Sequence, residues 1–119
     1  MAGNRTAFGR EQTRPSRVEL FAFYFLGFNP KGEYRFANAH HVARYYNVSS
    51  NAVLRWLEEM DLEPGKILRR QYDLPGAQLE LQLEAPDLTR EEILQRSEEI
   101  LGEMDTAMSG RKFWEEEFE

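Results

Sequence analysis

The sequence predicts a small, single-domain, all-α fold, and three observations support this prediction. The chain has 119 residues, a length typical of one domain built on one hydrophobic core. Hydrophobic residues make up 41% of it and charged residues 30%, the usual balance of a soluble globular protein. Two segments begin with the pattern that caps helix N-termini, at Ser16 and at Thr89.

The first helix is predicted at about residues 17–26. Ser16 and Glu19 form a capping box, and Gly27 tolerates the left-handed conformation that often ends a helix. Apolar residues cover most of the helix circumference, which indicates a central place in the core. Residues 29–32 then predict a type I turn, and residues 33–36 a short extended stretch.

Further helices are predicted at 39–46, at 50–60 and from Pro64 to about Tyr72, followed by a break at residues 74–76. Residues 77–85 fit two structures, because their leucines alternate at strand period. Proline in a two-residue loop disfavours a tight hairpin, so we favour a helix there. The alternative fold is a winged helix with a hairpin at 67–84.

The last helix begins with the capping box of Thr89 and Glu92 and is predicted to close at Gly110. We therefore divide the chain into a mobile N-terminal arm at 1–15, a helical domain at 16–110 and an acidic aromatic tail at 111–119. The apolar stripe of the last helix fits a dimer seam and a plain core equally well. Its members are Ile93, Ile100, Leu101, Met104 and Met108.

The charges are divided unevenly along the chain. Residues 1–72 hold 11 Lys+Arg and 7 Asp+Glu, a net charge of +4, whereas residues 73–119 hold 4 and 14, a net charge of −10. This asymmetry indicates an anionic partner for the basic half, although two solvated faces explain it equally well. The apolar run at 20–28 is too short to span a bilayer, so we expect a cytoplasmic protein without a membrane partner.

The residues predict no catalytic, metal or cofactor site. His40 and His41 point about 100° apart on a helix, and no cysteine is present to complete a metal site. The carboxylates lie on polar faces or in the tail, and the glycines form no phosphate-binding loop. We therefore do not expect an enzyme. Tyr45, Tyr46 and Trp56 resemble a base-stacking platform in composition, but their positions predict core packing.

The segment 38–57 meets the packing demands of two helices crossing at a tight bend. Ala43 is small where the helices approach, and Asn47 accepts a left-handed backbone at the bend. Val48 packs under the bend, and Ser49 can cap the second helix. The second helix returns to the core through Val53, Trp56 and Leu57. Residues 38–60, about a fifth of the chain, closely resemble the helix-turn-helix of bacterial repressors and site-specific recombinases.

This resemblance implies a small DNA-binding transcriptional regulator whose second helix enters the major groove of double-stranded DNA. Arg55 would read guanine and Asn51 adenine. The full set of base-reading residues is Ser50, Asn51, Leu54, Arg55 and Glu58. The backbone contacts are expected from Lys31, Arg35, Arg44, Lys66, Arg69 and Arg70. One helix contacts few bases, so a homodimer on two half-sites is expected.

An adaptor that binds other proteins is the alternative function. Every residue that carries the resemblance is a packing residue, so it indicates geometry rather than DNA binding. Glu58, Glu59 and Asp61 would repel phosphates, and an exposed Leu54 suits a protein surface. The tail would supply a second contact, through Phe113, Trp114 and Phe118. The tail has two other interpretations, a frayed terminus and a segment that folds back on the basic half.

Overall fold

The computed structural model describes residues 14–35 and 38–117, and within these ranges the fold is all-α, as predicted. The predictions for residues 1–13 and 118–119 lie outside the described residues. Among residues 14–35 and 38–117, the one pairing of extended residues is an isolated antiparallel bridge between Phe28 and Tyr34. The α-helices are α2 (Arg17–Phe21), α3 (Ala39–Tyr46), α4 (Ser50–Glu59), α5 (Pro64–Leu68), α6 (Leu74–Glu84) and α7 (Arg90–Glu117).

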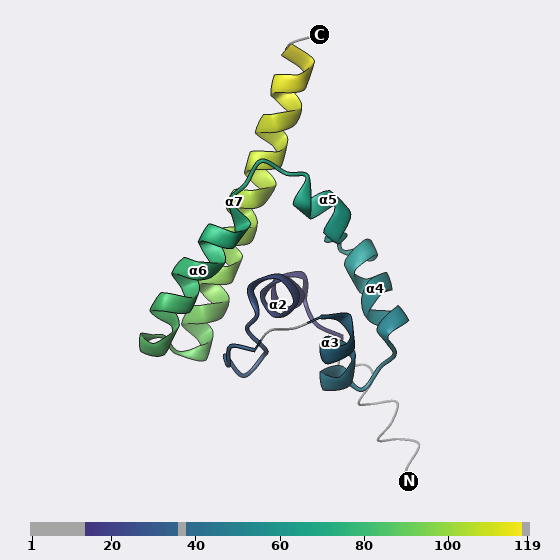
Figure 1. Ribbon diagram of the computed structural model, residues 1–119, viewed down its shortest axis with the longest axis vertical. Helices are drawn as coiled ribbons and strands as arrows, with labels where there is room; N and C mark the ends of the chain where they lie inside the picture. Colours follow the sequence, from purple (N-terminus) through teal and green to yellow (C-terminus); the bar gives the residue numbers. More distant parts are fainter. Residues whose placement is uncertain (1–13, 36–37, 118–119) are drawn as a thin grey trace.

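Helix α2 occupies the centre of the molecule, with α3 and α4 on one side and α6 and α7 on the other (Figure 1). The predicted capping box forms, since the Glu19 amide donates to the Ser16 hydroxyl and the Ser16 amide to the Glu19 carboxylate. The helix continues as a π-helical segment, Ala22–Leu26, and ends at Gly27 with φ of 88°. Its apolar side chains are almost fully buried, at Leu20, Phe21, Phe23 and Leu26.

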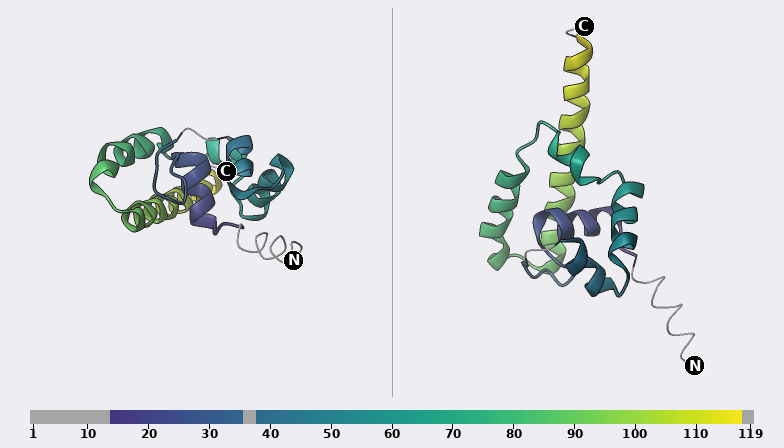
Figure 2. Two further views of the ribbon diagram at one scale, coloured as in Figure 1. Left: turned by 90° about the horizontal axis from the view of Figure 1, so that it is seen from below. Right: turned by 45° about the vertical axis from the view of Figure 1, so that its right-hand side comes forward.

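Helices α6 and α7 run side by side and cover the opposite flank of α2 (Figures 1 and 2). The winged-helix alternative is wrong, because residues 67–84 contain the end of α5 and the whole of α6 instead of a hairpin. The predicted break at 74–76 is the start of α6: Asp73 accepts a hydrogen bond from the Gly76 amide, and Pro75 lies in the first turn. Proline loses nothing there, because the first amides of a helix have no intrahelical partner.

The alternating leucines of α6 therefore do not mark a strand. Leu81 is fully buried, whereas Leu79 and Leu83 are 55% and 72% exposed. The chain also leaves α5 earlier than expected, at Leu68 rather than near Tyr72.

Helix α7 begins at the predicted capping box of Thr89 and Glu92. It continues through Gly110 to Glu117, so the predicted end at Gly110 is wrong. Its described apolar stripe is core: Ile93, Ile100, Leu101 and Met104 are at most 7% exposed. These four side chains are therefore already covered within one chain. No helix in the described ranges has the length and apolarity needed to cross a membrane.

Asp105 of α7 joins three parts of the chain through two arginines. The Arg17 guanidinium binds its carboxylate through two hydrogen bonds, of 2.9 and 3.2 Å, and also donates to the Met60 carbonyl. The hydrogen bond to Asp105 is the main reason that the pKa of Arg17 is raised. Arg70, whose side chain is only 2% exposed, lies 3.5 Å from Asp105 and 3.8 Å from Asp61. The carboxylates thus compensate a buried guanidinium that has no hydrogen-bond partner of its own in the described structure.

We expect Asp105→Asn to lower the free energy of unfolding by about 3 kcal/mol, because it leaves the buried Arg70 charge poorly compensated. The matched control is Glu91→Gln, which removes the acid of a pair whose side chains are 51% and 77% exposed. That change should cost less than about 1 kcal/mol. Urea unfolding followed by circular dichroism measures both, and equal losses in the two variants would contradict the assigned role of Asp105.

Candidate nucleic-acid interface

Three residues, Asn47 to Ser49, connect α3 to α4 and fix the direction of the second helix. Asn38 caps α3 by accepting from the His41 amide, and α3 ends at Asn47 in the left-handed conformation, with φ of 59° and ψ of 47°. Ser49 caps α4 by accepting from the Ala52 amide. The predicted helices and caps are therefore confirmed within about one residue, whereas their membership of the DNA-binding helix-turn-helix class stays a prediction.

The inward faces of α3 and α4 pack as the sequence predicted. Ala43 is 4% exposed, and the fully buried Val53 and Leu57 come from α4. Trp56 is half-buried and packs edge-on against Tyr46 at 5.8 Å between ring centroids. Burial raises the pKa of Tyr46 far above its usual range, which agrees with its place in the core. This packing holds α4 against α3 and leaves the opposite face of α4 outside.

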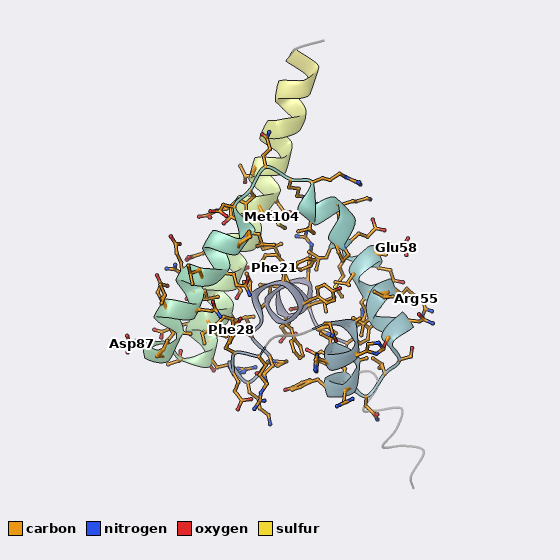
Figure 3. The ribbon with its side chains drawn as sticks, in the orientation of Figure 1. Phe21, Phe28, Arg55, Glu58, Asp87 and Met104 are labelled. Carbon is orange, nitrogen blue, oxygen red and sulfur yellow. The ribbon has the colours of Figure 1, made fainter. Side chains whose placement is uncertain are left out.

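The outward face of α4 carries Asn51, Leu54, Arg55 and Glu58, all exposed. Figure 3 shows Arg55 and Glu58 pointing away from the body of the molecule. Ser50, the fifth predicted base reader, is half-buried, and its hydroxyl lies 2.9 Å from Nδ1 of His40. Four of the five predicted residues thus reach solvent on one helix face, while Ser50 is engaged with α3.

The six cations predicted to contact the DNA backbone separate into three groups. Lys66 and Arg69 are exposed beside α4, and Lys66 is paired with Glu63 at 3.1 Å. Lys31, Arg35 and Arg44 lie together around a separate groove. Arg70 is buried and paired with aspartates, so it cannot contact a phosphate. Its predicted role as a backbone contact is therefore wrong. The sequence did not indicate this, because its partners are distant along the chain.

The groove lies between the turn that precedes α3 and α3 itself, and we call it the basic groove. It encloses about 660 Å³ and is open to solvent. Its floor includes Phe23, and its basic and aromatic walls consist of Lys31, Tyr34, Arg35, Arg44 and Tyr45. Tyr34 and Tyr45 are 45% and 40% exposed. Sequence reasoning missed this use of Tyr45, which was expected in the core, and gave no role to Tyr34.

Four exposed cations have no carboxylate partner in the described part of the chain. They are Lys31, Arg44, Arg55 and Arg69. Every other described arginine or lysine with a described side chain lies within 4.0 Å of an acid, as Arg14 does with Glu59 at 3.0 Å. An uncompensated cation on a surface attracts anions. All four lie between residues 31 and 69, the region that contains α3 and α4.

The predicted partner-binding tail is helical in its described part, whereas a separate segment after the last helix was expected. Phe113 and Trp114 belong to α7, and Phe118 lies outside the described residues. With 28 residues, α7 is about 42 Å long, and its C-terminal part extends beyond the other helices (Figure 1). The helix therefore separates its acidic C-terminal end from the basic groove, which lies near the N-terminus of α7.

No known family model, curated protein or solved structure matches this chain. Within the described ranges, no group of three or more metal-ligating side chains is assembled. The candidate binding surfaces of the described structure are the outward face of α4 and the basic groove.

We expect Asn47→Ala to destabilise the protein by about 1 kcal/mol, because a Cβ with no polar group disfavours the left-handed conformation at the bend. Asn47→Gly should be neutral or slightly stabilising, because glycine adopts positive φ without this penalty. The control is Asn51→Ala on the exposed face of α4, for which we expect no loss. Thermal unfolding followed by circular dichroism gives the order; equal effects of alanine and glycine at position 47 would contradict it.

Proposed function

We propose that the protein binds double-stranded DNA, with the outward face of α4 in the major groove. The observation that supports this most directly is Arg55, an exposed arginine with no acidic partner in the described structure, on a face that points away from the molecule (Figure 3). Arg55 and Asn51 are one turn apart on this face. An arginine suits the two acceptors of guanine, and an asparagine suits the acceptor and donor of adenine.

The other two exposed side chains of the face also have partners among the bases. Glu58 can accept a hydrogen bond from the amino group of cytosine, and Leu54 can contact the methyl group of thymine. Glu58 would be repelled by a nearby phosphate, so its place is toward the base edges rather than the backbone. The proposed contacts thus assign a base-directed role to every exposed residue of the face.

Backbone contacts would come from cations on both sides of α4. Arg44 lies on the preceding helix and Arg69 directly after α5, and neither has an acidic partner among the described residues. Lys66, and Lys31 and Arg35 of the basic groove, extend this set. Such contacts position a protein on DNA without reading its sequence. They also predict binding that weakens steeply as the salt concentration rises.

The proposed regulator would act as a homodimer, because one short helix reads too few bases for a specific site. Four of the five residues of the predicted dimer seam, Ile93, Ile100, Leu101 and Met104, pack inside the chain and are not free for this contact, while the side chain of Met108 lies outside the described part of the structure. The contact surface would therefore lie elsewhere on the protein.

We expect Arg55→Ala to weaken binding to a duplex selected from a randomised pool by about tenfold, within the 1–3 kcal/mol range of a base-reading arginine. The control is Arg96→Ala, which removes the same charge from α7, where Arg96 is paired with Glu84 and Glu99. Fluorescence anisotropy at fixed salt measures both. Equal affinities of the Arg55 variant and the unmodified protein for the selected duplex would contradict the proposed reading role.

A second candidate function, binding of another protein, is favoured by one observation. Leu54 is 47% exposed and borders a hollow between α4 and α5 that is also lined by Glu58, Pro64 and Arg69. An apolar centre with a polar rim is a feature of protein-binding surfaces. This candidate predicts no binding to random duplex even at low salt, whereas the DNA proposal predicts binding there with a steep salt dependence.

A further inference from the structure

The basic groove contains exposed aromatic side chains, which have no role in contacts with a duplex backbone. Two large aromatic side chains, Tyr34 and Tyr45, are exposed among three cations. Each ring rests on an internal phenylalanine: Tyr34 lies 5.3 Å from Phe28, and Tyr45 lies 5.4 Å from Phe23 in an edge-to-face arrangement. The rings are thus held in place by the core while a large part of each faces solvent.

The wall that carries Tyr34 is fixed by hydrogen bonds to its backbone amides. The Asn29 side-chain oxygen accepts from the amides of Lys31 and Glu33, and the Arg35 amide donates to the Gly27 carbonyl at 2.6 Å. Gly27 has φ of 88°, and a Cβ added there would lie 2.7 Å from the Tyr34 ring. Glycine at this position therefore allows the ring to lie close to the backbone. These contacts within the protein preform the groove.

The charges of the groove favour an anion. Lys31, Arg35 and Arg44 face one acid, Glu33. The Glu33 carboxylate is already engaged, because it accepts a 3.0 Å hydrogen bond from the Asn29 amide group and lies 3.9 Å from Nε of Arg35. The ligand that fits both the cations and the tyrosines carries phosphates and flat rings.

We infer that the basic groove binds a single strand of nucleic acid, with one base stacked on Tyr34, another on Tyr45, and the neighbouring phosphates at Lys31, Arg35 and Arg44. Stacking on aromatic side chains beside a positively charged groove is the usual way of holding single strands. A duplex keeps its bases stacked inside and presents none to the tyrosines. Small-molecule sites enclose most of their ligand, whereas this groove is open and suits a strand that passes through it.

This inference rests on the groove alone and does not require α4 to read a duplex. The two surfaces share Lys31, Arg35 and Arg44 in their proposed contacts, but the tyrosines belong to one and Arg55 to the other. Variants of these residues therefore separate the two ideas. Loss of duplex binding in Arg55→Ala with unchanged single-strand binding would show two independent sites.

The test is a titration of the full chain with a fluorescent oligothymidine of about ten nucleotides at low salt. We expect Tyr45→Ala and Tyr34→Ala each to weaken binding by about tenfold, since one stacked base is lost. Tyr45→Phe should retain most of the affinity, because the ring remains. The matched control is Tyr72→Ala, which changes a half-buried tyrosine that donates to Glu103 on α7 and lies outside the groove.

A second measurement uses the unmodified protein and so does not depend on the folding of any variant. An abasic strand of equal length keeps the phosphates and removes the bases, and we expect it to bind more weakly than oligothymidine by at least about tenfold. Equal affinity for the two strands, or no binding of oligothymidine at low salt, would overturn the inference. Thymidine monophosphate that binds as tightly as the strand would overturn it too, by showing a mononucleotide site.

Discussion

The contacts of Asp105 with Arg17 and Arg70 are the constraint on which the arrangement of this molecule depends. They join the N-terminus of the central helix, the segment after α5 and the long helix α7, three parts that are distant along the chain. Burying a guanidinium is costly unless carboxylates compensate it. Any arrangement that separated α7 from α2 would leave Arg70 inside the protein without Asp105, so the charge pattern selects one way of closing the core.

This closure separates the surface into two regions with different chemistry. Because α2 is covered by α6 and α7 on one flank and by α3 and α4 on the other, α4 has one face left for solvent (Figure 1). The turn at residues 28–35 packs back toward the start of α7 and leaves a groove against α3. The four cations without a described acidic partner lie on these two surfaces and their margins, whereas Arg17 and Arg70 join helices through Asp105.

Local demands of the backbone could be predicted from the sequence, and contacts between distant residues could not. Ser16, Gly27, Asn47 and Thr89 each satisfy a hydrogen bond or a backbone angle within a few neighbours, so their caps and ends were recognisable. The exposure of Asn51 and Arg55 followed from helical periodicity. The burial of Arg70 and the position of Tyr34 and Tyr45 at one groove depend on how distant parts of the chain pack, which no local pattern encodes. The predicted break at Pro75 and the predicted helix end at Gly110 were wrong, because proline also occurs in the first turn of a helix and a helix can contain glycine in its interior.

Helix α7 is attached to the rest of the protein at more than one level. Near its first turn, the Arg90 side chain donates to the Pro30 carbonyl, and a Cβ on Gly32 would come within 3.2 Å of the Arg90 backbone. Four turns further on, Asp105 holds it to Arg17. The wall of the groove that contains Lys31 is therefore attached to α7. The wall formed by α3 lies on the opposite flank of α2. The width of the basic groove therefore depends on how α7 packs against α2.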